Sequence, residues 1–233
     1  MKYCISDVHG EYELFLQLLK KINFSDKDEM YICGDIIDKG KSSVRLAKLV
    51  FSFPNIHCIM GNHEYEFLKY YHSLLENSPD DFELILDKLR KYFPYDGNLL
   101  GWDTVDRIEN LPYYIEREDF ICAHAGVPTD ANGMLLPLCE VESNKLVYDR
   151  KFKDKDFVHH SPKCVFFGHT ETSCVCGENK IIGYKRNPHS PIIGVKDFYK
   201  IHLDTGSWSA GILGCFCIDT LKAVYVKRTQ APN

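Results

Sequence analysis

The feature that most constrains the fold of this chain is a short apolar run that ends in polar residues, and it recurs along the sequence. The run at 3–5 continues as SDVHG, and the run at 30–33 continues as GDIIDKG. The runs at 57–60, 120–123 and 163–167 continue as GNHE, HAG and GHT. Apolar runs of this length, rich in β-branched and aromatic residues, predict buried strands. Each predicted strand therefore delivers polar side chains at its end.

Helical patterns separate the early strands. Apolar residues recur at spacings of three and four over 14–22 and 44–51, which predicts amphipathic helices. Two further strands are predicted near the end of the chain, at 200–203 and 214–218. Alternation of strand and helix predicts an α/β layered fold with short crossover connections.

The chain reads as one domain over residues 1–233, because no repeat or low-complexity linker divides it. A longer helical pattern over 82–93 interrupts the alternation, and we interpret it as part of a helical cap inserted at about 76–110. The segment 171–200, which contains several glycines and prolines, is expected to form a long loop or a hairpin.

Composition limits the partners. The chain has 233 residues, of which 45% are hydrophobic, enough for one well-filled core. Its formal net charge of −5 gives no electrostatic reason to expect nucleic acid or an anionic membrane surface. No apolar run approaches the roughly 20 residues of a membrane span, and the first strand begins too close to Met1 to leave room for a signal peptide. We therefore expect a cytoplasmic protein with neither a nucleic-acid nor a membrane partner.

The ten cysteines are expected to be structural. The C-V-C sequence at 174–176 has too few neighbouring donors for a zinc site, and the pair at 215–217 fits strand packing. Inside a buried strand a thiol packs as a small hydrophobic group. Five cysteines lie in the predicted strands: Cys4, Cys33, Cys58, Cys122 and Cys164.

The polar residues at the strand ends include the donors of a metal site. In open α/β sheets the carboxyl ends of strands face the ligand crevice, so these side chains should meet in one place. The mixture of imidazole, carboxylate and amide suits borderline divalent ions, manganese first, with iron, zinc or cobalt as alternatives. The number of donors is too large for one open catalytic ion and fits two ions that share a carboxylate. The predicted ligands are Asp7, His9, Asp35, Asn62, His124 and His169.

These motifs, in this order and spacing, resemble those of the calcineurin-like metallophosphoesterases, and more narrowly the bacterial and phage branch of the phosphoprotein phosphatase family. Each motif alone is weak, but the ordered set, each member after a predicted strand, is specific. The resemblance covers Tyr3 to about Asp219. It implies a central β-sandwich flanked by helices in four layers, αββα, with a dinuclear metal centre. It also implies that Asp7 and His9 hold one ion, that Asp35 bridges, and that Asn62, His124 and His169 hold the other.

The chemistry of phosphate-monoester hydrolysis agrees with this layout. The reaction is among the slowest without a catalyst, and two ions roughly 3.5–4 Å apart can bind phosphate oxygens and make hydroxide available for direct attack on phosphorus. The leaving group needs a proton, for which His63 is the predicted general acid and Asp38 its orienting partner; this pairing also follows the family pattern. The role of Glu64 stays open between structure and function.

Two cations and an amide are predicted to bind the substrate phosphate. The family usually has arginine where this chain has Lys39, which lacks the planar fork that grips two oxygens. Arg150 falls where related bacterial phosphatases place a second phosphate-binding arginine, and an exposed surface cation is the rival interpretation. Asn62, already a predicted metal ligand, completes this set.

The sequence leaves three functions open. The first is a dinuclear metal-dependent phosphomonoesterase, a serine/threonine protein phosphatase of broad specificity that acts on phosphorylated protein or a small phosphoester. The GNHE motif and the spacing within DIIDKG favour it. The second is a symmetrical diadenosine-polyphosphate hydrolase, a neighbouring branch with the same metal centre and a different cap. The third is an inactive phospho-binding module, against which the intact His63 and Asp38 argue.

Overall fold

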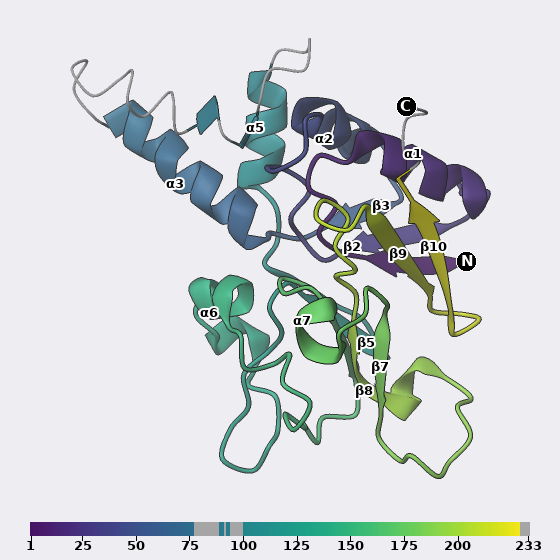
Figure 1. The fold of residues 1–233 in the computed structure, drawn as a ribbon. Coiled ribbons are helices and arrows are strands. Elements are labelled where there is room, and N and C mark those ends of the chain that lie inside the picture. The colour runs from purple at the N-terminus through teal and green to yellow at the C-terminus, as the bar shows by residue number, and fades with distance from the viewer. Residues whose placement is uncertain (77–88, 91, 94–99, 229–233) are drawn as a thin grey trace.

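Two five-stranded sheets form the centre of the molecule (Figure 1). The computed structural model describes residues 1–76, 89–90, 92–93 and 100–228. The first sheet has the strand order β10-β9-β1-β2-β3, and the second has the order β4-β5-β6-β8-β7. The strands are β1 (Lys2–Ile5), β2 (Glu29–Ile32), β3 (Ile56–Cys58), β4 (Tyr114–Glu116), β5 (Phe120–Ala123), β6 (Cys164–Phe167), β7 (Ile182–Lys185), β8 (Phe198–His202), β9 (Ile212–Cys217) and β10 (Lys222–Lys227).

The strands that precede the polar motifs are parallel within each sheet. β1 pairs with β2 and β2 with β3, with Cys4 opposite Tyr31 in register. β5, β6 and β8 are likewise parallel, with Cys122 opposite Phe166. Antiparallel strands flank both sets: β9 and β10 extend the first sheet, and β4 and β7 border the second. Because parallel strands all end at the same edge of a sheet, the segments that follow them gather there.

Helices cover the outer faces of the sheets. Figure 1 shows α1 and α2 above the first sheet and α6 and α7 beside the second. In α1 the buried residues Leu14, Phe15 and Leu18 follow one face of the helix. The helices are α1 (Tyr12–Lys21), α2 (Ser43–Ser52), α3 (Asn62–Glu76), α5 (Trp102–Glu109), α6 (Ser143–Tyr148) and α7 (Ser173–Cys176), with 3₁₀ turns η2 (Leu138–Glu140) and η3 (Val195–Asp197).

Alternate residues of the central strands face different layers. Cys4 of β1 and Cys122 of β5 belong to the apolar layer between the two sheets. The next residue of β1, Ile5, faces the opposite way and packs with Leu14 in the outer layer. Ile121 of β5 likewise packs in the outer layer of the second sheet. This two-residue alternation builds helix, sheet, sheet and helix in turn, so the predicted four-layer αββα fold is confirmed.

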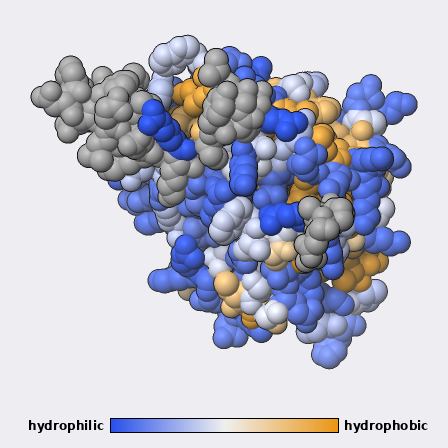
Figure 2. Space-filling view, turned by 45° about the horizontal axis from the view of Figure 1, so that its top comes forward, coloured by the Kyte–Doolittle hydropathy of each residue, from blue (hydrophilic) through white to orange (hydrophobic). Residues whose placement is uncertain are grey.

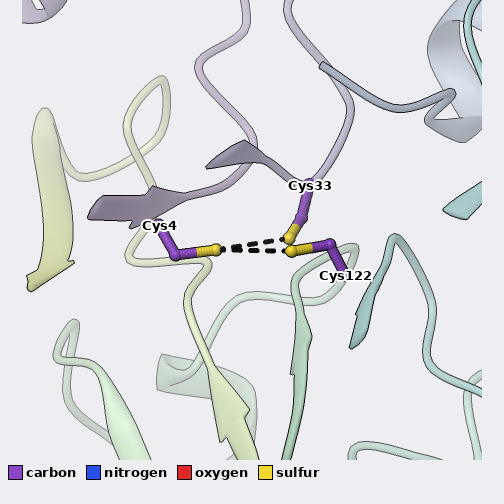
Figure 3. Close-up of side chains that lie close together, drawn as sticks. All are labelled: Cys4, Cys33 and Cys122. Atoms are coloured by element: carbon purple, nitrogen blue, oxygen red, sulfur yellow. Dashed lines mark hydrogen bonds between the residues drawn. The ribbon is translucent and has the colours of Figure 1, made fainter. Parts of the chain in front are cut away.

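Three thiols meet in the layer between the sheets, as Figure 3 shows. The Sγ of Cys4 lies 3.7 Å from that of Cys33 and 3.9 Å from that of Cys122. All three are free cysteines with fully buried side chains, and burial raises the pKa of Cys4 and Cys33 well above its usual range. The thiols of Cys4 and Cys33 are therefore neutral and pack as small apolar groups. Burial also opposes ionisation of Cys122, but its hydrogen bonds with Cys33 and Cys4 outweigh burial and lower its pKa to about 5.

The sequence did not predict the flanking strands β4 and β10, and it predicted a long loop or a hairpin over the segment that contains β7. Their residues are largely half-buried or exposed, so they lack the apolar runs that marked the central strands. The segment 171–200 does contain a hairpin strand, because β7 pairs antiparallel with β8. Most of the predicted cap at 76–110 lies outside the described residues. Its described part includes α5, which packs against α2 and α3.

In the view of Figure 2, hydrophobic residues form patches among hydrophilic ones. None of the described helices has the length and apolar character that a bilayer span requires. The large exposed apolar side chains include Trp102 and Trp208, which are 75% and 47% exposed.

A buried imidazole at the end of β8 gives a prediction about acid stability. The ring of His202 is fully buried, stacks on Phe167, and donates a hydrogen bond through Nε2 to the carbonyl of Thr170. Burial lowers the pKa of His202 to about 4 from 6.5. The unfolded chain therefore takes up a proton at this residue below about pH 6.5, whereas the folded protein does not, so acid favours unfolding.

We expect the free energy of unfolding to fall between pH 6.5 and 4, with His202 alone contributing up to about 1.4 kcal/mol per pH unit. The measurement is urea unfolding at several pH values for the wild type and for His202→Gln, which should have the shallower slope. His189→Gln, at an exposed position, is the matched control. Equal slopes for His202→Gln and the wild type would contradict the prediction.

Candidate metal centre

The polar side chains at the strand ends converge between the two sheets. Asp7 and His9 follow β1, and Asp35 follows β2. Asn62 is the first residue of α3, after β3. His124 and His169 come from the second sheet, directly after β5 and shortly after β6. The contacts below show that the structure brings all six predicted ligands together.

The carboxylate of Asp35 is shared by two groups of donors. Its Oδ2 lies 3.7 Å from Nε2 of His9, 3.8 Å from Nε2 of His63 and 3.4 Å from Nε2 of His124. The ligand atoms of His9, Asp35 and His63 all lie within 4.8 Å of one another, and so do those of Asp7, Asp35 and His124. Two clusters joined by one carboxylate have the arrangement that two ions with a bridging ligand require.

Backbone carbonyls fix the orientation of two imidazoles. Nδ1 of His9 lies 3.1 Å from the carbonyl oxygen of Ile37, and Nδ1 of His124 lies 2.7 Å from that of Cys33. A carbonyl oxygen can only accept a hydrogen bond, so Nδ1 carries the proton in both rings. The Nε2 lone pairs therefore face the cluster, in the orientation that a metal ligand needs.

Lone pairs also face one another around Asn62. Its Oδ1 lies 2.9 Å from Nε2 of His124 and 2.8 Å from Nδ1 of His169. Because the proton of His124 is on Nδ1, neither its Nε2 nor the amide oxygen can donate to the other. Nε2 of His169 is buried and has no hydrogen-bond partner among the described residues. Converging acceptors of this kind fit a bound cation.

The protonation states suit metal binding. Burial lowers the pKa of both His9 and His169 to about 3 and also lowers that of His124, so these imidazoles are neutral at neutral pH. Burial, together with the nearby carboxylates of Asp7 and Glu64, raises the pKa of Asp35 well above its usual range. Neutral imidazoles cannot offset the charge of an ionised Asp35, whereas divalent cations can.

The site backbone is held in an unusual conformation. Six of its non-glycine residues have positive φ, between 49° and 69°: Asp7, His9, Asp35, Asp38, Lys39 and His169. Such conformations persist only where the surroundings enforce them. Close packing contributes: a Cβ at position 168 would stand 2.0 Å from Oδ2 of Asp7, which explains Gly168.

Glu64 supports the loop that carries Asp35, a role that the sequence had left open. Its carboxylate is fully buried and accepts hydrogen bonds from the backbone N–H groups of Asp35, Ile36 and Gly61 at 2.8, 2.8 and 3.0 Å, and from that of Ile37 at 3.1 Å. Charge-assisted bonds to backbone N–H groups are among the stronger hydrogen bonds. Glu64 thereby ties the end of β2 to the start of α3.

His63 and Asp38 form the pair that the sequence predicted. Nδ1 of His63 lies 2.7 Å from Oδ2 of Asp38, and its Nε2 points toward Asp35. The backbone N–H of His63 donates to Oδ1 of Asp35 at 3.0 Å. The imidazole of His63 is 15% exposed, so it lies between the buried carboxylates and the surface.

The two predicted phosphate-binding cations differ in how they meet the cluster. Nζ of Lys39 donates to Nε2 of His9 at 2.9 Å, so its ammonium lies against a predicted ligand. Arg150 is exposed, and its charge is one of those that, after burial and His124, lower the pKa of His169. Lys39 thus lies beside His9, a predicted ligand from the first sheet. Arg150 acts on His169, a predicted ligand from the second sheet.

The donors fit borderline divalent ions. The cluster offers imidazole nitrogen and carboxylate and amide oxygen, the set that manganese, iron and zinc accept. The nearby thiols face the layer between the sheets, where Cys4 contacts Cys33 and Cys122 (Figure 3). Cys33 meets the site only through its backbone carbonyl.

Comparisons with known proteins agree with this geometry. A family model described as calcineurin-like phosphoesterase matches residues 3–191. The symmetrical bis(5'-nucleosyl)-tetraphosphatase of Buchnera aphidicola subsp. Acyrthosiphon pisum (strain 5A) is 28% identical over 143 residues, which are 60% of this chain and 49% of that protein. The protein of that name from Buchnera aphidicola subsp. Schizaphis graminum (strain Sg) is 32% identical over 131 residues, 54% of this chain and 44% of that protein. The chain spans about half the length of these curated relatives.

A solved structure shows the same fold. The metallophosphoesterase of Sphaerobacter thermophilus aligns with a TM-score of 0.60 over 99% of this chain and 89% of that chain, at 16% sequence identity. At this identity the likeness concerns only the arrangement of the two sheets and their helices.

The shared carboxylate gives a prediction about metal content. Asp35→Asn keeps the shape of the side chain but removes the negative charge that both clusters share, so metal and activity should be lost together. We expect metal affinity to fall by at least the roughly 10–100-fold that loss of an outer-shell partner costs. Elemental analysis of protein purified without chelator measures this, with the exposed Asp26→Asn as control. Full metal content in Asp35→Asn would contradict the shared position.

Proposed function

Because the chain belongs to the calcineurin-like phosphoesterase family, we propose that it is a metal-dependent hydrolase of dinucleoside polyphosphates. The preferred reaction cuts a dinucleoside tetraphosphate at its centre. The oxygen of one water bonds to a central phosphorus, the bond from that phosphorus to the bridging oxygen breaks, and two nucleoside diphosphates leave. The observation that carries the phosphohydrolase chemistry is the pair of donor clusters joined at Asp35.

The names of the relatives support a dinucleoside tetraphosphate as the substrate. The curated relatives given above are called symmetrical bis(5'-nucleosyl)-tetraphosphatases, although they match only part of this chain. This name fits the second of the three functions that the sequence left open better than the first, a protein phosphatase. The intact His63–Asp38 pair supports an active enzyme over a binding module.

We assign the cations to the residues as follows. Asp7 and His9 would hold one divalent ion, and Asn62, His124 and His169 the other, with Asp35 shared and manganese as the first choice of metal. This division follows the family pattern, because the ligand atoms themselves group His9 with His63 and Asp7 with His124. Nε2 of His9 also lies 3.8 Å from Oδ1 of Asp7, which supports their sharing one ion. When bound, the ions polarise the phosphate and lower the pKa of water. The protein supplies the rest: rigid positions for the ligands, a charge-assisted network around Glu64, and cations beside the site.

His63 is the proposed general acid. Nδ1 of His63 donates to Asp38, which orients the ring so that Nε2 faces the site and can donate a proton to the departing oxygen. The need for this proton depends on the leaving group. A phosphate is a weaker base than a phenoxide or alkoxide, so cleavage of a phosphoanhydride needs the acid less than cleavage of a simple phenyl or alkyl ester.

The substrate assignment is tested in three separate incubations of the protein with Mn²⁺. One contains diadenosine tetraphosphate, one p-nitrophenyl phosphate and one a phosphoserine peptide. We expect ADP as the only nucleotide product, and a higher kcat/KM for the dinucleotide than for the peptide. Asp35→Asn protein, prepared identically, controls for contaminating phosphatases. ATP with AMP as products, or faster turnover of the peptide, would overturn the assignment; binding without turnover of any substrate would indicate the phospho-binding module.

The role of His63 predicts a dependence on the leaving group. His63→Asn should keep its metal and slow hydrolysis of phenyl phosphate by roughly 10²–10⁴-fold, the range for loss of a general acid. The loss should be smaller for p-nitrophenyl phosphate and for diadenosine tetraphosphate, whose leaving groups are weaker bases. Steady-state kinetics with elemental analysis measure both, and His72→Asn, at a half-exposed position, is the control. An equal loss on every substrate would contradict acid catalysis.

A further inference from the structure

A cavity of about 410 Å³ opens directly beside the candidate metal centre. Its size lies within the range of roughly 300–1,000 Å³ that is usual for small-molecule sites. Its lining includes aromatic and cationic side chains together: Tyr12, Lys39, Lys41, Trp208 and Arg228. None of the metal-centre roles assigned above, apart from phosphate binding by Lys39, uses these residues.

Two contacts join the cavity to the cluster. Lys39, which lines the cavity, donates to Nε2 of His9. On the opposite side, Ser207 donates its hydroxyl to the backbone carbonyls of Asp7 and Val8, and Trp208 follows it in the chain. The walls of the cavity are therefore immediate neighbours of two proposed ligands, so a ligand in the cavity can extend into the metal centre.

The backbone of Trp208 is fixed while its indole remains 47% exposed. Nη2 of Arg228 donates to the carbonyl oxygens of Ser207 at 3.2 Å and Trp208 at 2.9 Å, and to Oε1 of Glu11 at 2.7 Å. An aromatic ring on an anchored backbone offers stacking surface at little entropic cost. Tyr12 offers less, because the guanidinium of Arg45 lies 4.0 Å above its ring.

The charges favour a ligand with phosphates at the end nearest the metal centre. Of the acidic side chains in the lining, Glu11 is paired with Arg228, and Glu13 lies 3.9 Å from Arg45. Lys39 and Lys41 lie in the loop just before α2, whose first turn has no acidic residue to neutralise the helix dipole. The ammonium groups of Lys39 and Lys41 and an exposed indole in one lining match a nucleotide, with its phosphate chain and its base.

We propose that this cavity is the nucleoside subsite: one base of the substrate stacks on Trp208, and the polyphosphate runs past Lys39 to the metal centre. This assignment rests on the proposed function, because it names the part of the dinucleotide that the metal centre does not hold. It gives the enzyme a reason to prefer nucleotides over simple phosphate esters.

The chain offers a matched control for the test, because Trp102 and Trp208 are its only tryptophans. Trp102 is 75% exposed and lines a separate apolar cavity with Phe67 and Tyr71. Trp102→Phe leaves Trp208 as the sole indole, and Trp208→Phe leaves Trp102. We titrate both holoenzymes with ADP and follow tryptophan fluorescence. ADP should change the emission of the Trp102→Phe protein in a saturable way and leave that of the Trp208→Phe protein unchanged.

Kinetics provide the second readout. Trp208→Ala should lower kcat/KM for diadenosine tetraphosphate by roughly 5- to 150-fold, the equivalent of about 1–3 kcal/mol for one stacked base. Its effect on p-nitrophenyl phosphate, which has no nucleoside, should be clearly smaller, and Trp208→Phe should restore part of the loss. Trp102→Ala is the control.

The experiments distinguish failure of the proposed nucleoside subsite from failure of the proposed function. Equal losses on both substrates, or a fluorescence response from Trp102 in place of Trp208, would overturn the subsite. If the wild type hydrolyses p-nitrophenyl phosphate but not diadenosine tetraphosphate, the proposed function fails. The ADP titration then decides by itself whether Trp208 contacts a nucleotide.

Discussion

The buried carboxylate of Asp35 is the constraint on which the rest of the site depends. It is 1% exposed and lies near Asp7 and Glu64, whose charges, added to burial, oppose its ionisation. In a medium of low dielectric constant such repulsion is poorly screened. The imidazoles of His9 and His124 are neutral and present lone pairs to Asp35, so they add no compensating charge. Divalent cations resolve this conflict, which couples the stability of the site to metal binding.

The conformation that brings these groups together is itself strained and is held by the two sheets. Non-glycine residues at positive φ cost on the order of 1–3 kcal/mol each, and six of them lie in this site. Glu64 and the close approach of Gly168 to Asp7 hold the turns in place. Because the strands on either side are packed on both faces, the turns cannot relax without disturbing the core. The β-sandwich therefore holds the ligand side chains in fixed positions before a metal ion binds.

The central strands and the convergence of the site could be predicted because each depends on a local pattern. Apolar runs marked the strands, and the rule that parallel strands end at one edge placed Asp7, Asp35 and His124 together. The flanking strands could not be found in this way, because β10 is largely exposed. The role of Glu64 could not be decided from the sequence, because only the fold shows which backbone N–H groups donate to its carboxylate. Trp208 was missed because no motif surrounds it. Its meaning depends on a cavity built from four separate segments of the chain, which only the fold brings together.

The position of Lys39 shows how a lysine can stand where the family usually has arginine. Its ammonium donates to Nε2 of His9, the same lone pair that we assign to a metal ion. Two cations cannot share that lone pair, so an ion bound there displaces the ammonium, and the flexible four-carbon stem lets it turn toward the cavity and a phosphate. A planar guanidinium would grip two phosphate oxygens at once, and lysine gives up that geometry. Arg150, whose charge lowers the pKa of His169, is the second cation that we propose for phosphate binding. The proposed polyphosphate would then meet one cation beside His9 and another near His169, so ligands from both sheets would have a positive charge close to them.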